Sequence, residues 1–355
     1  MNGTTAPSPW LPTAPCTPGH CAAHPEPAHP ESDGAPGQAG VVRALVRLTA
    51  GLGTVLLGLL VAPATGLLPT AVRLALVRHW TRAAVRAFGV RARYEGVPAD
   101  GPLLVVANHV SWLDIPLIAA VLPGRMVAKS EVRRWPVLGT LAALGGTLFI
   151  ARDGLRSLPG TVREMSGVLA GGGRVIVFPE GSTWCGREGG RFRPAAFQAA
   201  LDAGRAVQPV RIDYGPTDAA AYVGADPLGS SLWRVVSARR VTAVVRMPEP
   251  LTGLRHQDRR TLAAAAQRAV EQSGVDRRAV DRRAVEQSAG DRRAVGHSAG
   301  DRRAVRQPAV DRSGADRRVV AQRAVASDSA NLPSLSVHQR SSSSPASARS
   351  ARTPA

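Results

Sequence analysis

Lysine is almost missing from this 355-residue sequence: Lys129 is the only one, so nearly all of the 45 basic residues are arginines. Cysteine is also scarce. Cys16, Cys21 and Cys185 are odd in number and irregularly spaced, which argues against a disulfide framework. Two histidines lie near Cys16 and Cys21, but no second cluster of ligands completes a metal site, so we expect no bound metal.

Aromatic residues make up only 4% of the chain, whereas its formal net charge is +19. The arginine-rich C-terminal region has no interleaved aromatic side chains, so it offers no platform on which bases would stack. We therefore expect no nucleic-acid partner. Arginine in place of lysine, together with abundant Ala, Gly and Pro, is typical of a GC-rich genome, and part of the positive charge follows from that composition.

Both ends of the chain lack the large apolar residues that a folded core requires. Residues 1–40 are rich in Pro, Ala, Gly, Ser and Thr, and residues 274–355 carry Asp-Arg-Arg-Ala-Val repeats before a Ser- and Pro-rich stretch. Such compositions bury too little apolar surface to offset the entropy lost on folding. We expect a disordered leader at 1–40 and a disordered tail at 274–355. The repeats are either incidental or contact anionic lipid.

A long apolar run lies between residues 48 and 72, where no side chain is charged and arginines flank both ends. A spanning helix needs about 20 apolar residues. Pro63 leaves a clean piece at 48–62 that is only about 22 Å long at 1.5 Å per residue. We therefore favour a membrane-dipping two-helix hairpin at residues 41–89 over a full span. An ordinary buried helix pair is the alternative.

Residues 70–88 form the second half of this hairpin and have an amphipathic pattern. One face is basic, with Arg78, His79, Arg82 and Arg86. The opposite face is apolar, with Leu76, Val77, Trp80, Ala84 and Phe88. An interfacial helix lays its apolar face in lipid and keeps its arginines near anionic head groups. We therefore expect this apolar face to contact the membrane.

From residue 90 to residue 273, short apolar runs alternate with helix-like stretches, which predicts a single layered α/β domain. The expected strands are 103–107, 125–128, 147–150, 174–178, 206–212 and 241–246. The expected helices are 115–121, 136–144, 155–170, 195–203 and 259–272. Open α/β sheets carry their chemistry at the carboxyl ends of the strands.

The strand at 103–107 runs directly into Asn108 and His109. His109 and Asp114 are five residues apart, so on one ideal helix they would point about 140° apart. A strand, a loop and a helix that begins near Asp114 would bring them together. A carboxylate on one imidazole nitrogen leaves the other free to accept a proton. The spacing therefore predicts a general base, with a purely structural histidine as the alternative.

Three later stretches complete an ordered set: residues 146–152 read GTLFIAR, residues 174–181 read RVIVFPEG, and residues 207–210 read VQPV. A His-x4-Asp motif, a strand-end arginine, Pro-Glu-Gly and Val-x-Pro-Val, in this order, resemble the glycerolipid acyltransferases of the lysophosphatidate acyltransferase (PlsC-like) family. The resemblance covers about residues 90–210, together with the hairpin before them.

The resemblance implies an α/β catalytic domain on the cytoplasmic face of the cell membrane. It would transfer a fatty acyl group from acyl-CoA or acyl carrier protein, used as co-substrate, to a lysolipid hydroxyl, without a cofactor. His109 would be the general base and Asp114 would orient it. The residues implied in acceptor binding are Arg152, Glu180, Gly181, Ser182 and Thr183. An ion pair between Arg152 and Glu180 that joins two strand ends is the structural alternative.

One departure from the family concerns the acceptor. Many lysophosphatidate enzymes carry arginine soon after Pro-Glu-Gly-Thr, whereas Gly181 is followed here by Ser182, Thr183 and Trp184. Three arginines downstream are candidates for a phosphate contact: Arg187, Arg191 and Arg193.

The expected reaction converts 1-acylglycerol-3-phosphate to phosphatidate. Relatives that acylate lyso-ornithine lipid tend to have Thr rather than Arg after the motif, so lyso-ornithine lipid is the alternative acceptor. A non-catalytic membrane scaffold with a basic tail is an interpretation of another class. The intact pair of His109 and Asp114 argues against it.

Overall fold

The computed structural model describes residues 14, 16, 38–150, 158–215, 217–224, 226–252 and 258–274. The chain divides after residue 294 into two units, and every described residue belongs to the first. The expected leader and tail lie almost entirely outside these residues.

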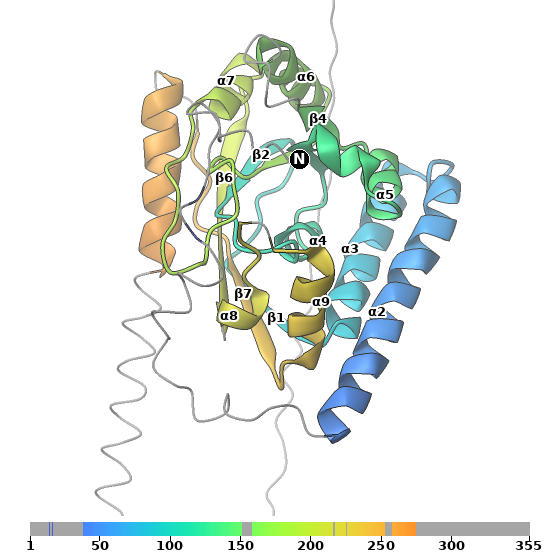
Figure 1. The fold of residues 1–355 in the computed structure, drawn as a ribbon. Coiled ribbons are helices and arrows are strands. Elements are labelled where there is room, and N and C mark those ends of the chain that lie inside the picture. The colour runs from blue at the N-terminus through green and yellow to red at the C-terminus, as the bar shows by residue number, and fades with distance from the viewer. Residues whose placement is uncertain are drawn as a thin grey trace, which may run out of the picture. The chain divides into compact units, whose positions relative to one another are not determined.

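A seven-stranded sheet forms the centre of the domain, in the order β1-β7-β6-β2-β5-β3-β4 (Figure 1). The strands are β1 (Val90–Glu95), β2 (Leu103–Ala107), β3 (Arg125–Lys129), β4 (Leu148–Ile150), β5 (Val175–Val177), β6 (Ala206–Gly215) and β7 (Val241–Arg246). Neighbouring strands are parallel except β6 and β7, which pair antiparallel. Consequently β1 and β7 run opposite to the other five strands.

Helices cover both faces of the sheet (Figure 1). They are α2 (Gln38–Thr65), α3 (Thr70–Ala87), α4 (Asp114–Ala119), the 3-10 turn η1 (Ser130–Arg134), α5 (Leu138–Leu144), α6 (Leu158–Ala170), α7 (Ala195–Asp202), α8 (Thr217–Ala220) and α9 (Leu228–Ser237). A further helix spans residues 259–274. The expected layered α/β fold is confirmed, while β1, α8 and α9 were not expected.

Strand β2 separates two apolar cores because all five of its residues are buried. Leu103, Val105 and Ala107 face a core that includes side chains of α3, α4, α8 and α9. Leu104 and Val106 face a second core with side chains of α6, α7 and the helix 259–274. Side chains alternate between the two faces of a strand, so a continuous apolar run is what a strand covered on both sides requires.

Helix α2 is longer than the clean apolar piece predicted from the sequence. It begins at Gln38 and continues past Pro63, giving 28 residues and a length of about 42 Å at 1.5 Å per residue. Pro63 lies in the last turn, so the single i→i−4 bond that its missing N–H removes lies near the end of the helix. Among the described residues, one helix, Gly40–Thr65, is long and apolar enough by length and composition to cross a membrane.

The expectation that the apolar face of residues 70–88 contacts lipid is wrong for its two aromatic side chains, whereas Leu76 is exposed. Phe88 is only 6% exposed, and the indole nitrogen of Trp80 donates to the carbonyl oxygen of Thr54 on α2 at 2.9 Å. Gly51 and Gly58 make room for these two rings. A Cβ atom at Gly51 would lie 2.2 Å from the Phe88 ring, and one at Gly58 2.4 Å from the Trp80 ring.

The exposed apolar surface therefore belongs mainly to α2. Its exposed large side chains are Val41, Val42, Leu45, Val46, Leu52, Leu56, Leu57, Leu60 and Val61. Arg47 fastens α2 to the domain, since its guanidinium donates to the carbonyl oxygens of Val236 at 3.1 Å and Ala238 at 2.6 Å, at the end of α9.

Candidate active site

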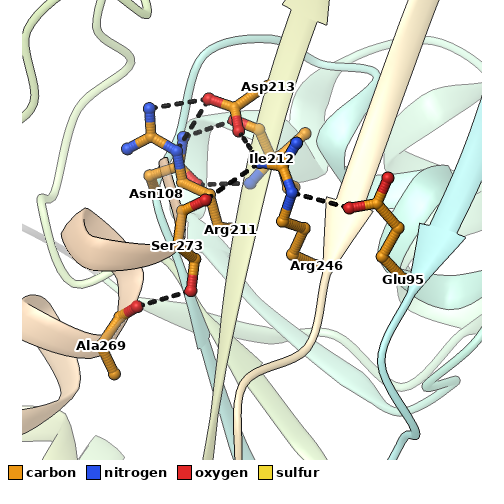
Figure 2. Close-up of polar contacts among 8 residues, drawn as sticks. All are labelled: Glu95, Asn108, Arg211, Ile212, Asp213, Arg246, Ala269 and Ser273. Atoms are coloured by element: carbon orange, nitrogen blue, oxygen red, sulfur yellow. Dashed lines mark hydrogen bonds and ion pairs between the residues drawn. The ribbon is translucent and has the colours of Figure 1, made fainter. Parts of the chain in front are cut away.

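The candidate site begins where β2 ends. The side chain of Asn108 bonds twice to the backbone of Ile212 on β6: Oδ1 accepts from the N–H at 2.8 Å, and Nδ2 donates to the carbonyl oxygen at 2.9 Å (Figure 2). The last backbone pair between the two strands is Ala107 with Val210. Asn108 thus extends the β2–β6 connection by its side chain and frees the backbone to turn away from the sheet.

His109 and Asp114 meet across this turn. Nδ1 of His109 lies 2.7 Å from Oδ2 of Asp114, which is fully buried at the first residue of α4. The same oxygen accepts the backbone N–H groups of Val110 at 2.7 Å and Ser111 at 2.9 Å. A carboxylate only accepts hydrogen bonds, so we assign the imidazole proton to Nδ1. Nε2 is then the nitrogen that can accept a proton.

The second oxygen of Asp114 also has a donor. The hydroxyl of Tyr214, on β6, donates to Oδ1. Burial, together with the neighbouring Asp114 carboxylate, raises the pKa of Tyr214 well above its ordinary value, so this hydroxyl stays protonated. Both oxygens of the buried carboxylate are therefore satisfied, which fixes its orientation toward His109.

The imidazole ring is held on one face as well. It stacks on Phe178, the residue after β5, with ring centroids 4.0 Å apart and an interplanar angle of 14°. The side chain of His109 keeps 19% of its surface exposed. The ring is therefore fixed by Asp114 and Phe178 while part of it remains accessible.

Glu180 and the segment after it hold the backbone of His109. Oε2 of Glu180 accepts the N–H of His109 at 2.9 Å, and Oε1 accepts the N–H of Gly190 at 3.3 Å. The carbonyl oxygen of His109 accepts the N–H of Trp184 at 2.7 Å. Glu180 is 5% exposed, and burial raises its pKa to about 8, although the two N–H groups oppose that shift.

A cavity of about 180 Å³ opens beside His109. Its walls come from the loop after β2, from residues 180–192, from Arg211 on β6 and from the helix 259–274. The charged side chains that line it, besides Glu180, are Arg187, Arg211, Glu188 and Glu271. The cavity therefore offers both guanidinium groups and carboxylates to a bound head group.

The other residues named from the sequence are distributed more widely. Gly181 forms the turn, with φ +77° and its N–H donating to the carbonyl oxygen of Phe178 at 3.1 Å. Ser182 and Thr183 are half-buried and do not line the cavity. Of the three candidate phosphate contacts, Arg187 lines the cavity, whereas Arg191 and Arg193 are exposed outside it. Arg152 lies outside the described residues.

Several residues of the site were not found from the sequence. Tyr214 is 100 residues from its partner Asp114, and no local pattern marks it. Phe178 is part of the Pro-Glu-Gly stretch, but its stacking on His109 depends on the position of β5 beside β2. Arg211 directly follows Val-x-Pro-Val, which was the one available signal.

No group of three or more His, Cys, Asp or Glu side chains that could hold a metal ion occurs within the described residues.

The sequence is similar to those of known acyltransferases. The acyltransferase family model matches residues 90–213. The chain is 39% identical over 240 residues to the lyso-ornithine lipid O-acyltransferase of Pseudomonas aeruginosa, and the match covers 64% of this chain and 92% of that enzyme. It is 40% identical over 147 residues to the 1-acyl-sn-glycerol-3-phosphate acyltransferase of Neisseria gonorrhoeae, covering 40% of this chain and 58% of that enzyme.

The fold is similar to the crystal structure of the 1-acyl-sn-glycerophosphate acyltransferase PlsC from Thermotoga maritima. The TM-score is 0.54 at 23% identity, and the match covers 68% of this chain and 97% of that one.

Proposed function

Because the chain belongs to the PlsC-like acyltransferase family, we propose that it transfers a fatty acyl group from an acyl thioester to the free hydroxyl of a lysolipid, with His109 as the general base. The observation that carries this proposal is the 2.7 Å contact between Nδ1 of His109, which lines the cavity, and Oδ2 of the buried Asp114. The donor is acyl-CoA or acyl carrier protein, used as co-substrate, and the reaction needs no cofactor.

The chemistry follows from the proton on Nδ1 of His109. As the lysolipid hydroxyl oxygen attacks the thioester carbonyl carbon, Nε2 accepts its proton, and the carboxylate of Asp114 stabilises the imidazolium that forms. Collapse of the tetrahedral intermediate breaks the C–S bond, and the imidazolium returns the proton to the leaving thiolate. A C–O ester bond replaces the thioester. A base in this position accelerates such a step by about 10²–10⁴-fold.

The proposed acceptor is lyso-ornithine lipid. The Pseudomonas aeruginosa enzyme named for that substrate is matched over 92% of its length, and no arginine directly follows Gly181. An ornithine head group carries a carboxylate and an amino group, and the cavity holds guanidinium groups and carboxylates. The second candidate is 1-acylglycerol-3-phosphate, favoured by the Neisseria gonorrhoeae match and by Arg187 in the cavity wall.

We further propose that the exposed apolar surface of α2 enters the membrane and that the catalytic domain lies on its cytoplasmic face. Both a lysolipid and a long-chain acyl-CoA are amphipathic, so an enzyme held at the bilayer surface meets them where they are concentrated. Flanking arginines on α2 and α3 would then lie near anionic head groups.

The test is an acyl-transfer assay with the purified full-length protein in mixed micelles. Labelled acyl-CoA or acyl carrier protein is supplied with lyso-ornithine lipid, 1-acylglycerol-3-phosphate or lysophosphatidylcholine. We expect transfer to lyso-ornithine lipid, its loss in His109→Ala, and full activity in His79→Ala, a matched change at an exposed histidine of α3. Full activity of His109→Ala would refute the base assignment. No transfer to any acceptor would leave the non-catalytic scaffold.

A further inference from the structure

Arg211 lies on β6 beside Ile212, the residue whose backbone binds Asn108. Its guanidinium faces Asp213 with one edge: Nε lies 2.8 Å and Nη2 2.7 Å from the same carboxylate oxygen. The third nitrogen, Nη1, points away from Asp213 (Figure 2). The side chain is only 14% exposed, and it lines the cavity that also contains His109.

Asp213 is paired with two arginines, so its negative charge is not available to Arg211 alone. Its other oxygen accepts from Arg246, which also reaches Glu95 at 2.8 Å and the carbonyl oxygen of Ser273 at 3.3 Å (Figure 2). Glu95 is 44% exposed, so solvent screens it strongly. Nη2 of Arg246 is buried without a hydrogen-bond partner among the described residues. The half-buried carboxylate beside Arg211 is thus divided between two guanidinium groups at this end of the sheet, next to the cavity.

The helix 259–274 closes the cavity on the side of Arg211. A Cβ atom at Gly274 would lie 3.1 Å from Cζ and 3.2 Å from Nε and Nη2 of Arg211, so the absence of a side chain there gives the guanidinium its space. Glu271 precedes Gly274 by three residues, and residues at this spacing share a helix face. Both residues line the cavity. Glu271 is thus presented to the same space as Arg211.

Glu271 is also oriented by its neighbours. Nε2 of Gln267 donates to its Oε1 at 2.7 Å, and Oε1 of Gln267 accepts the backbone N–H of Phe192 at 3.0 Å. These two hydrogen bonds connect Glu271, through Gln267, to the segment that follows Glu180. The carboxylate is therefore held at the cavity wall by its contact with Gln267.

We propose that Arg211 and Glu271 form a subsite for a zwitterionic head group. Arg211 binds the carboxylate of the acceptor and Glu271 binds its ammonium group. This inference rests on the proposed function and deepens it. It assigns the choice of acceptor to β6 and to a helix that lies beyond residues 90–213, the segment that the acyltransferase family model matches. A phosphate monoester would gain the contact with Arg211 but would be repelled by Glu271.

Steady-state kinetics with both acceptors separates these contributions. Losing a charge-assisted hydrogen bond costs about ten- to a hundredfold in binding. Arg211→Gln should therefore raise KM for lyso-ornithine lipid by that factor, with kcat and the KM for acyl-CoA little changed. Glu271→Gln should raise KM for lyso-ornithine lipid and lower KM for 1-acylglycerol-3-phosphate. The preference for lyso-ornithine lipid should therefore become smaller or reverse. Arg268→Gln, at an exposed position of the same helix, is the matched control and should leave both values unchanged.

Because Arg211 is paired with Asp213, its loss removes an ion pair that stabilises the fold, so Arg211→Lys and a thermal unfolding curve accompany Arg211→Gln. Glu271 is exposed, and its variant carries the test independently of folding. If the ratio of the KM values for the two acceptors is the same in Glu271→Gln as in the wild type, the subsite proposal is overturned. A wild-type enzyme that prefers 1-acylglycerol-3-phosphate overturns it as well. An active wild type with an unaltered KM in folded Arg211→Gln refutes this inference alone. A wild type that acylates no lysolipid refutes the proposed function, and this inference with it.

Discussion

The wild-type protein should become less stable as the pH rises, because the buried carboxyl group of Glu180 ionises. Replacing Glu180 by glutamine should abolish this pH dependence. The carboxyl group is 5% exposed, and burial raises its pKa from the ordinary 4.5 to about 8. The N–H groups of His109 and Gly190 favour the ionised form, but they compensate for only part of the lost hydration. Folding therefore favours the protonated carboxyl group.

The sign and size of the effect follow from proton linkage. In the unfolded chain the carboxyl group ionises near pH 4.5, whereas in the folded protein it stays protonated to about pH 8. The stabilising contribution is complete below pH 4.5 and is lost as the pH rises to 8, at about 1.4 kcal/mol for each pH unit. Between pH 6 and pH 8 the free energy of unfolding should fall by about 2 kcal/mol through this one group, because the slope decreases as the pH approaches the folded pKa. Above pH 8 the loss levels off.

The assay is urea unfolding in detergent, followed by tryptophan fluorescence at pH 6, 7, 8 and 9, for the wild type and Glu180→Gln. Glutamine keeps an acceptor for the N–H of His109 but turns an amide toward Gly190, which costs stability equally at every pH. We expect the difference in the free energy of unfolding between the two proteins to shift by about 2 kcal/mol in favour of the variant from pH 6 to pH 8. Glu164→Gln, at an exposed position of α6, controls for the loss of a charge. A difference that stays constant across this range would refute the reasoning.

Three further predictions use the same preparations. Tyr214→Phe should lower kcat about tenfold without changing KM, because the carboxylate proposed to orient the base loses one donor. Tyr94→Phe removes a buried hydroxyl that has no hydrogen-bond partner among the described residues and should leave kcat unchanged; equal effects of the two substitutions would contradict the assignment. Gly58→Leu should lower the Tm because its side chain collides with Trp80, and an unchanged Tm would contradict the packing of α2 on α3. Removing residues 275–355 should leave turnover unchanged in the acyl-transfer assay. A large loss of turnover would show that the tail takes part in the reaction.

The strands that sequence reasoning located well are the ones covered on both faces. β2 is a run of five buried residues, and its bounds and those of β7 agree with the expected 103–107 and 241–246. β1 was missed because it lies at the sheet edge with every second residue exposed, and arginines at those positions resemble a polar loop. α9 was missed for a different reason: three of its first four residues are Gly or Ser, which are weaker helix formers than Ala or Leu.

The contact between His109 and Asp114 was predictable because it is local: a strand, a turn and a helix start separate residues that are only five positions apart. The rest of the site depends on the order of the strands. Glu180 and Tyr214 are 71 and 100 residues from their partners, and they arrive there because β5 and β6 flank β2 on either side. Strand ends can be found in a sequence, but their lateral order is set by packing across the whole sheet.

This dependence on strand order also explains why Glu180, expected to bind the acceptor, contacts the backbone of His109 as well as lining the cavity. The groups proposed for catalysis come from the ends of three adjacent strands, so they restrain one another, and a change at any of them should disturb His109. Arg211 shares that sheet, but it faces the helix 259–274. The hydrogen bonds and the ring contact described for His109 come from residues outside that helix: Asp114, Glu180, Trp184 and Phe178. Residues of that helix can therefore alter the head group that is accepted while the base and its carboxylate stay in place, and this separates acceptor choice from the chemical step.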